Sequence, residues 1–270
     1  MKTLKHRAIV QKSKLWVIKV GSSILTAQKG KPDPQVFARL AREVAGLRKS
    51  GKKVILVSSG AIACGMHKMG LKKKPAQISQ KQAIAAVGQI TLMDHYAGAF
   101  SKHKLQIAQI LLTREDVHSP ARSLNARHAI HELLKMGIVP IINENDTVAV
   151  EEIKVGDNDN LSAHVARLVG AQLLVVLTDQ DGLYTSDPRI DVKAEKISLV
   201  EKLDKKIHRL ARDTQGQGTT GGMITKLQAA EHATKHRVAT VIASGLKEKM
   251  LQSLAKGHEE GTLFLPAKRL

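Results

Sequence analysis

The amino-acid sequence predicts an α/β protein with a mainly parallel central sheet and helices on both faces. Three observations lead to this prediction. Short apolar runs alternate with segments of helical periodicity, without a low-complexity linker or an internal repeat. The runs are apolar at nearly every position, as in strands that are buried on both faces. Polar clusters follow several runs directly, where α/β proteins place their ligands.

Four strands and three helices are predicted in the first half of the chain. The strands are the apolar runs at residues 15–20, 54–57, 107–112 and 138–142. The first helix begins near Pro34 and ends at Gly51, a residue that suits the left-handed turn after a helix. A long helix covers residues 79–102. The third helix begins at Ser119 and Pro120, the order of a capping residue and a first helical proline, and ends at Gly137.

The second half continues the same alternation. A helix is predicted at residues 161–168 and a strand at 173–177, followed by a helix, a glycine-rich loop and another helix. A strand at residues 239–243, a helix and a last strand at 262–265 complete the chain. Because the strands are parallel, their carboxyl ends lie at one edge of the sheet. We therefore expect the polar segments that follow them to meet there.

The composition limits the class of protein. The 270 residues suffice for one large α/β domain or two small ones, and 43% are hydrophobic and 25% charged, as in soluble globular proteins. No apolar run is long enough to span a membrane, and residues 1–14 hold no secretory signal. The single cysteine, Cys64, cannot form an internal disulfide. We therefore expect a cytoplasmic protein without a membrane partner.

The net charge is unusual, because 43 Lys and Arg face 24 Asp and Glu, a formal charge of +19. Such a balance raises the question of nucleic-acid binding. However, one Trp, two Tyr and three Phe give few stacking platforms for single strands, and no zinc-finger spacing or RNA-recognition motif is present. The cations are scattered, apart from residues 2–14 and 72–74. We favour a solvated surface that also attracts anionic substrates over a nucleic-acid partner.

Two polar clusters interrupt the apolar pattern. They are Asn143 to Asp146, and Gly156 to Asn160, the second with the sequence GDNDN. Carboxylates and amides packed this densely cost folding energy unless water or a ligand satisfies them. Asp and Asn also occur in ordinary turns and helix caps, so either cluster alone fits both interpretations. The repetition favours a functional site.

Two short turns could bring backbone N–H groups to a ligand. Lys19 lies at the end of the first strand, directly before the turn Gly21-Ser22-Ser23, which could cradle a phosphoryl group. Residues 58–61, with the sequence SSGA, form a second turn of small residues, where a ligand could approach the backbone. Each turn alone is weak evidence for a ligand site, since a lysine at a strand end is usually solvated and the second turn could be an ordinary connection from strand to helix.

A glycine-rich segment at residues 216–226 leads into a helix whose first turn carries Lys226. Free N–H groups, the helix dipole and this lysine would favour a polyphosphate. The segment is not a P-loop, because Gly222 and Lys226 are four positions apart, and it lacks the strand and acidic partner of a Rossmann fingerprint. A flexible surface loop is the alternative interpretation.

Taken together, these segments resemble the glutamate 5-kinases of the amino acid kinase superfamily. The resemblance extends from residue 15 to residue 264. It rests on the segments IKVGSS, VSSGAIACG, KQAIAAVGQ, LLTREDV, LNARHAI, IVPIINENDTVA, EIKVGDNDNLSA, LLVVLTDQDGLYTSDPR and TTGGMITKLQAA. Single turns of this kind recur across the superfamily, whereas the combination of NEND with GDNDN is selective for this branch.

The resemblance implies a three-layer amino acid kinase fold and the first step of proline biosynthesis. ATP, with Mg²⁺, would phosphorylate the side-chain carboxylate of L-glutamate to γ-glutamyl phosphate. Two alternatives remain. One is a sister kinase that acts on acetylglutamate or aspartate, and the other is a basic nucleic-acid-associated protein built on a kinase fold, since fold alone does not fix function.

The resemblance also assigns residues to roles. Lys19 and Lys226 should contact the transferred phosphoryl group, with Asp159 holding both lysines, so that Lys226→Ala and Asp159→Ala should nearly abolish turnover. The residues that match glutamate-binding positions are Ser59, Asp146 and Asn158. Those that match nucleotide-binding positions are Lys19, Thr178, Asp179, Thr220, Gly221, Gly222, Met223, Ile224, Thr225 and Lys226. No residue is assigned as a metal ligand.

The same resemblance predicts the domain organisation and the partners. A basic arm at residues 1–14 precedes a single kinase domain at 15–270, with a substrate lobe at about 15–160 and a nucleotide lobe at about 161–265. The PUA domain that follows the kinase domain in many relatives is not expected, because the chain stops at Leu270. Proline is expected as a feedback ligand, glutamyl-phosphate reductase as a functional partner and a homo-oligomer as the assembly.

Overall fold

The structure is a computed structural model that describes residues 2–26, 31–149, 158–213 and 222–267. In these ranges, eight strands form one sheet in the order β3-β4-β2-β1-β5-β9-β10-β8. Neighbouring strands are parallel except β9 and β10, which are antiparallel. The strands are β1 (Leu15–Val20), β2 (Lys53–Ser58), β3 (Ile107–Leu112), β4 (Val139–Glu144), β5 (Leu173–Thr178), β8 (Leu199–Val200), β9 (Ala239–Ser244) and β10 (Thr262–Phe264).

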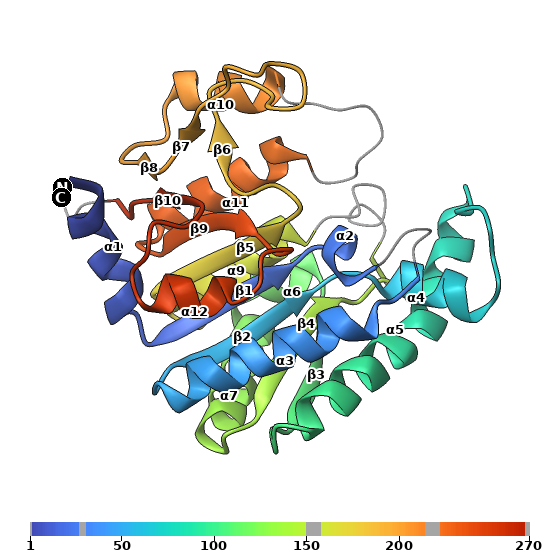
Figure 1. The fold of residues 1–270 in the computed structure, drawn as a ribbon. Helices are drawn as coiled ribbons and strands as arrows, with labels where there is room; N and C mark the ends of the chain where they lie inside the picture. Colours follow the sequence, from blue (N-terminus) through green and yellow to red (C-terminus); the bar gives the residue numbers. More distant parts are fainter. Residues whose placement is uncertain (1, 27–30, 150–157, 214–221, 268–270) are drawn as a thin grey trace.

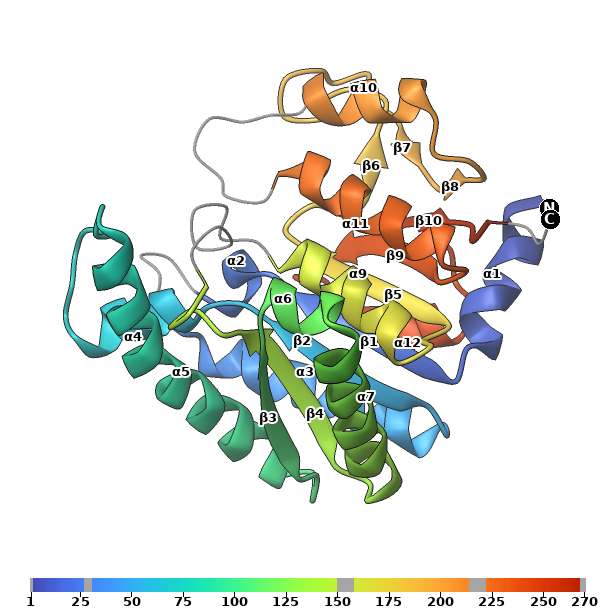
Figure 2. The same ribbon diagram turned by 180° about the vertical axis from the view of Figure 1, so that it is seen from behind.

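Helices lie on both faces of this sheet, which confirms the predicted fold class (Figures 1 and 2). The helices are α1 (Lys2–Lys12), α2 (Ser22–Leu25), α3 (Pro34–Lys49), α4 (Ala61–Lys68), α5 (Ile78–Ser101), α6 (Arg114–His118), α7 (Pro120–Lys135), α9 (Asp159–Leu168), α10 (Lys205–Asp213), α11 (Met223–Lys235) and α12 (Met250–Ala255). A small antiparallel pair, β6 (Leu183–Tyr184) and β7 (Lys196–Ile197), stands apart from the main sheet. No helix in the described ranges has the length and apolar character needed to cross a membrane.

Two cores follow from the period of two along each strand. In β1, Trp16 and Ile18 belong to the core beneath α1, α3, α5 and α12, whereas Val17 belongs to the core beneath α7, α9 and α11. All three side chains are fully buried. Because each strand contributes to both cores, the strands are apolar throughout, as the sequence indicated. Lys19 has the same parity as Val17, so it lies on the face that α9 and α11 cover.

The predicted strands all appear, with ends within two residues of the expected ones. The helix predicted from Pro34 begins at that residue, where the Asp33 side chain accepts a hydrogen bond from the Gln35 backbone N–H at 2.9 Å. Seven elements were not predicted, namely α1, α2, α4, α6, β6, β7 and β8. Of these, α2, β6, β7 and β8 have only two to four residues, which carry too little periodicity to be recognised.

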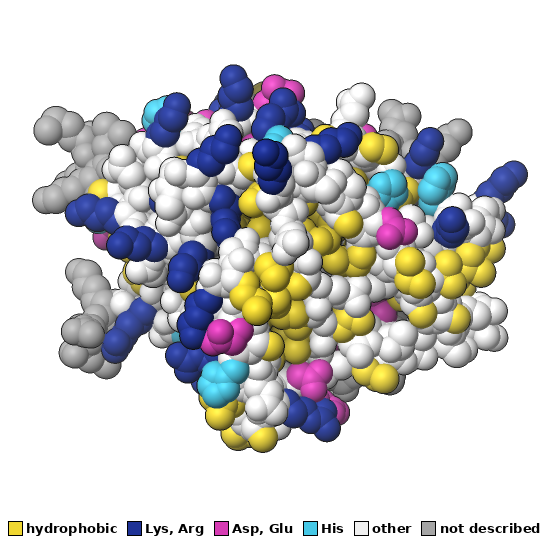
Figure 3. Space-filling model, turned by 90° about the horizontal axis from the view of Figure 1, so that it is seen from below, with side chains coloured by type: hydrophobic (Ala, Val, Ile, Leu, Met, Phe, Trp, Pro, Cys, Tyr) yellow, Lys and Arg dark blue, Asp and Glu magenta, His cyan; other side chains and the backbone are white. Residues whose placement is uncertain are grey.

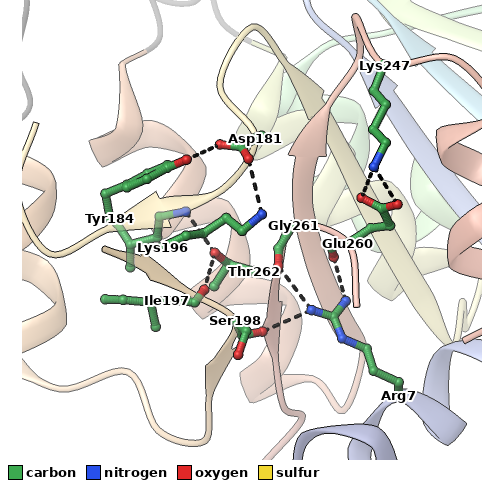
Figure 4. A network of polar contacts seen from close by, with 11 residues as sticks. Arg7, Asp181, Tyr184, Lys196, Ile197, Ser198, Lys247, Glu260, Gly261 and Thr262 are labelled. Carbon is green, nitrogen blue, oxygen red and sulfur yellow. Dashed lines mark hydrogen bonds and ion pairs between the residues drawn. The ribbon is translucent and has the colours of Figure 1, made fainter. Parts of the chain in front are cut away.

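The basic segment at the amino terminus forms α1 and packs against the last part of the chain. Figure 4 shows the Arg7 guanidinium donating to three backbone carbonyls, those of Ser198, Glu260 and Gly261, at 3.0, 2.6 and 3.0 Å. Burial lowers the pKa of Arg7, and Glu259 and Glu260 oppose this shift. In the same network, the Thr262 hydroxyl donates to the Ile197 carbonyl at 2.6 Å. The bonds of Arg7 join α1 to the β7–β8 connection and to the residues directly before β10, and the Thr262 bond joins β10 to β7.

Helices α4 and α5 cross at an unusually short distance, and two glycines permit it. A Cβ atom on Gly88 would lie 1.8 Å from the Ala61 carbonyl oxygen and 2.3 Å from the Gly65 nitrogen. A Cβ atom on Gly65 would lie 2.0 Å from the Ile84 carbonyl oxygen. The obstacles are backbone atoms, which cannot rotate away as side chains can. The contact therefore fixes α4, and with it the turn that follows β2.

We expect Gly88→Ala to lower the free energy of unfolding by about 3 kcal/mol or more, because the new methyl group must displace α4. Gly98→Ala is the matched control on the same helix, since a Cβ atom there meets no described atom within 4 Å. The control should raise stability by about 0.5–1 kcal/mol, because alanine favours a helix over glycine. Urea denaturation of both variants measures this difference, and equal stabilities would contradict the assigned packing.

Candidate active site

A buried carboxylate joins two lysines at the carboxyl edge of the sheet. Asp159, the first residue of α9, forms ion pairs with Lys19 at the end of β1 and with Lys226 in the first turn of α11. The Lys226 Nζ atom lies 3.2 Å from Asp159 Oδ2, and the Lys19 ammonium contacts Oδ1. The Thr225 hydroxyl donates to Oδ2 at 3.0 Å. The structure thus brings together the three residues that were predicted to be catalytic.

This group of three carries an excess positive charge in a shielded position. Asp159 is fully buried, and Lys19 and Lys226 are 4% and 7% exposed. A buried carboxylate is tolerated only when opposite charges and hydrogen bonds compensate for its lost hydration. Two ammonium groups and one carboxylate leave one net positive charge. That charge favours an anionic ligand beside the lysines.

The local structure explains how residues so far apart in sequence meet. β1 lies between β2 and β5, and its partner positions place Val20 beside Ser58 and beside Leu177. The chain segments that leave these three strands therefore begin side by side. Helices α9 and α11 pack against each other, and both start at this edge. Their amino ends carry partial positive charge, which stabilises Asp159 and would also attract an added anion.

A second polar group lies next to the first and contains no charge. The side-chain amide of Asn158 donates to the Ser58 carbonyl and, at 2.7 Å, to Asn143 Oδ1. The backbone N–H of Ser59 donates to the Val20 carbonyl at 3.2 Å. The predicted residues Ser59 and Asn158 therefore lie at the same edge as Lys19. Asn158 directly precedes Asp159, so one peptide joins the two groups.

Asp146 lies in the turn that follows β4 and is half-buried. Burial raises the pKa of its carboxyl group to about 6, and the positive charge of Lys74 opposes this shift. A carboxylate whose hydration is partly lost gains most from a cationic partner. Asp146 is therefore suited to bind a positively charged group of a ligand.

The residues predicted to bind nucleotide fall in two places. Thr178 ends β5 and Asp179 follows it, next to the end of β1, and the Thr178 hydroxyl donates to Asp179 Oδ1 at 2.9 Å. Gly222 is the residue before α11. The other described members have different surroundings: Met223 is buried, Ile224 packs against the core and Thr225 contacts Asp159. Thr220 and Gly221 lie outside the described residues.

Gln89, Gln109 and Tyr96 were not predicted from sequence, whereas Asn143 belongs to the predicted polar cluster at residues 143–146. Asn143, Gln89 and Gln109 continue the hydrogen bonds of Asn158, and the Tyr96 hydroxyl lies 3.0 Å from Ser58 Oγ. Gln89 lies on the buried face of α5, between apolar residues. A glutamine among the apolar residues of a helix could have indicated this network from the sequence, because a buried side-chain amide requires hydrogen-bond partners.

The donor atoms at this edge suit a phosphate. Within the described ranges, no three His, Cys, Asp or Glu side chains lie close enough together to hold a metal ion. Two ammonium groups and two helix amino ends instead provide positive charge and hydrogen-bond donors. The carboxyl edge of the sheet is thus arranged to hold an anionic ligand.

Comparison with known proteins agrees with this geometry. The model of the amino acid kinase family matches residues 14–244. The chain is 47% identical over 261 residues to glutamate 5-kinase of Pelobacter propionicus, covering 97% of this chain and 70% of that protein. It is 49% identical over 265 residues to glutamate 5-kinase of Citrifermentans bemidjiense, with the same coverage of 97% and 70%.

Two solved structures share the fold. One is an isopentenyl phosphate kinase, with a TM-score of 0.65, 14% sequence identity, and coverage of 93% of this chain and 99% of that one. The other is the UMP kinase of Bacillus anthracis, with a TM-score of 0.63, 17% identity, and coverage of 96% and 98%. The chain therefore belongs to the amino acid kinase family and, within it, to the glutamate 5-kinases.

Proposed function

We propose that this protein transfers the γ-phosphoryl group of ATP to the side-chain carboxylate of L-glutamate, which gives γ-glutamyl phosphate and ADP in the first step of proline biosynthesis. The buried group of Lys19, Asp159 and Lys226 carries this proposal. It offers concentrated positive charge at the carboxyl edge of the sheet, where open α/β sheets bind their ligands.

The reaction needs positioning and charge compensation rather than a general base. The attacking carboxylate has a solution pKa of about 4.3, so it is already ionised. One of its oxygens forms a bond to the γ-phosphorus, while the bond from that phosphorus to the bridging oxygen of ADP breaks. The chief obstacle is the repulsion between two anions and the charge on the moving phosphoryl group. Lysine side chains and helix amino ends lower this obstacle.

In this proposal, Lys19 and Lys226 contact the moving phosphoryl group from two sides. Asp159 holds both ammonium groups in place, a role that its acceptor-only carboxylate suits. Lysine is appropriate here because its compact charge on a flexible stem can follow the phosphoryl group. Their ion pairs through one carboxylate support these roles.

The glutamate would bind beside the uncharged group. Ser59 and Asn158 lie next to Lys19, and Asp146 would pair with the ammonium group of the substrate. The raised pKa of the Asp146 carboxyl group, caused by burial, supports this pairing. Residues 15–160, which supply these side chains, would form the substrate lobe.

The nucleotide would bind on the side of β5 and α11, within a nucleotide lobe at residues 161–265. Thr178, Asp179 and the segment from Thr220 to Lys226 are the proposed contacts. The amino end of α11 supports a phosphate position there. Mg²⁺ would arrive with ATP as part of the substrate, since this ion is commonly held by phosphates with few protein ligands.

The product chemistry and the family suggest two further partners. An acyl phosphate hydrolyses readily, so an enzyme that consumes it, glutamyl-phosphate reductase, is the proposed functional partner in the cytoplasm. Proline is the proposed feedback ligand, and inhibition of turnover by added proline would test it. We do not propose a nucleic-acid partner.

The proposed homo-oligomer is supported by an apolar face. Val87 and Ile90 on α5 and Leu124 on α7 are exposed, Ile90 to 69%. Figure 3 shows hydrophobic side chains gathered in the middle of the side of the molecule where α5, β3 and α7 lie. β3 is the first strand of the sheet and pairs only with β4 among the described residues. A second copy could cover this face, and a monomeric mass by light scattering would contradict this.

The activity itself is tested by trapping the acyl phosphate with hydroxylamine in the presence of ATP and Mg²⁺. We expect hydroxamate from glutamate, and little from N-acetylglutamate or aspartate. Selective activity on one of the other acids would instead identify the protein as a sister kinase that acts on that acid. Inactivity on all three would overturn the proposed function.

Lys226→Ala should lower kcat by about 10²–10³-fold, because it removes a charge that stabilises the transition state. Lys235→Ala is the matched control, since Lys235 is an exposed residue of the same helix that pairs with Glu231. The control should keep wild-type turnover. Circular dichroism of both variants checks that they fold, and a folded Lys226→Ala protein with normal kcat would remove this lysine from the mechanism.

Asp146 should make the glutamate KM depend on pH. Its carboxyl group has a pKa of about 6, so it is protonated below that pH and loses the charge that would bind the substrate ammonium. We expect the KM for glutamate to rise by up to about tenfold per pH unit below 6, with the KM for ATP unchanged. In Asp146→Asn the KM should be high at every pH. A flat wild-type profile between pH 5 and 7 would argue against this pairing.

A further inference from the structure

A chain of side-chain amides runs from the substrate side of the site to the first strand of the sheet. Asn158 donates to Asn143 Oδ1 at 2.7 Å, and Asn143 on β4 donates to Gln89 Oε1 at 2.7 Å. Gln89 on α5 then donates to Gln109 Oε1 on β3 at 2.9 Å. We call these four residues the amide relay. Its first three members are buried, and Gln89 is 8% exposed.

One backbone carbonyl sets the direction of the whole relay. The Ser58 carbonyl can only accept a hydrogen bond, so the Asn158 atom that faces it must be the amide nitrogen. The same nitrogen faces Asn143, which must therefore present its oxygen. Asn143 then has its nitrogen toward Gln89, so Gln89 must present oxygen to Asn143 and nitrogen to Gln109. Reversing any one amide would place two donors or two acceptors together.

The direction of the relay decides what Asn158 can offer to a ligand. Its amide nitrogen has two hydrogens, and both are used inside the protein, one by Ser58 and one by Asn143. The remaining polar atom is the carbonyl oxygen Oδ1, which can only accept. An acceptor at this position complements a cationic donor such as an ammonium group.

Helix α5 supports this arrangement at a second point. The Tyr96 hydroxyl lies 3.0 Å from Ser58 Oγ, and both side chains are fully buried. Gln89 and Tyr96 are seven positions apart, or about two helical turns, so they lie on the same face of α5. This face therefore steadies both the Ser58 carbonyl and the Asn143 amide that together orient Asn158.

We propose that Gln89 is a positioning residue for amino-acid recognition. Through Asn143, it keeps the carbonyl oxygen of Asn158 available to the ammonium group of the substrate. The site then distinguishes an amino acid from a dicarboxylic acid of the same length that lacks the ammonium. This inference rests on the proposed function, because it assigns the relay to glutamate.

The experiment compares Gln89→Met, Gln89→Glu and Gln80→Met with the wild type. Methionine has a similar length but offers Asn143 no comparable acceptor. Glutamate keeps an acceptor oxygen toward Asn143 whether it is ionised or protonated. Gln80 is an exposed residue of α5, so Gln80→Met controls for the same substitution on the same helix. The KM values for glutamate and ATP, kcat, and the inhibition constant of glutarate are measured for each protein.

In Gln89→Met we expect the glutamate KM to rise about tenfold. This is the effect of losing one well-oriented hydrogen bond between Asn158 and the charged ammonium group of the substrate. The ATP KM and kcat should change by less than about threefold, and the glutarate inhibition constant by less than about twofold, since glutarate has no ammonium for Asn158 to accept from. Gln89→Glu should restore most of the glutamate KM. Gln80→Met should match the wild type.

Two results would overturn the inference. A wild-type glutamate KM in a folded Gln89→Met protein would show that the relay does not orient Asn158. Equal weakening of glutamate, glutarate and ATP would show a general structural role. Failure of the proposed function has a different signature, because the wild-type protein itself would then not phosphorylate glutamate, and the assignment of the relay to that substrate would fall with it.

Discussion

The arrangement of the site depends on the two ion pairs of Asp159. A strand end and two helix starts must meet at one buried carboxylate, and the three charged residues lie at positions 19, 159 and 226 of the chain. Without the carboxylate, two buried ammonium groups would repel each other in a region of low dielectric. Without the lysines, the carboxylate would lack compensation for its lost hydration. The positions of β1, α9 and α11 are therefore mutually constrained, and the sheet order β2-β1-β5 allows them to converge.

The start of α9 contributes one residue to the charged group and one to the hydrogen-bonded amides. Asp159 belongs to the charged group, where electrostatics suits a moving phosphoryl group, and Asn158 belongs to the amide relay, where hydrogen-bond direction suits recognition. The two residues share a peptide bond, so a shift of α9 displaces both. Charge tolerates small errors of distance because Coulomb energy falls slowly, whereas hydrogen bonds are directional. The amide relay allows only one direction of its hydrogen bonds, so it constrains the positions of the site residues more strictly than the ion pairs do.

Much of the architecture could be predicted from the sequence, because buried parallel strands are apolar at nearly every position and strong helices have clear ends. The match of β3 at Ile107–Leu112 and of the helix start at Pro120 illustrates this. The resemblance predicted Lys19, Asp159 and Lys226 as a group in which Asp159 holds both lysines, whereas strand and helix periodicity alone would not have brought these three residues together. Gln89 was missed, since its partners Gln109 and Asn143 lie 20 and 54 positions away and no local pattern reports such pairings. Thr220 and Gly221, which lie outside the described residues, stay predictions.

The contacts of Arg7 have a consequence for the order in which the chain acquires its structure. Arg7 donates to carbonyls 253 and 254 positions later in sequence, directly before β10, the last strand along the chain. During synthesis, the first helix leaves the ribosome long before its acceptors exist, and it cannot dock until β10 has been made. Contacts between residues this far apart in sequence form slowly, because the chain loses conformational entropy before the contact can compensate for it. Arg7 can therefore make these two contacts only after the segment directly before β10 has been synthesised.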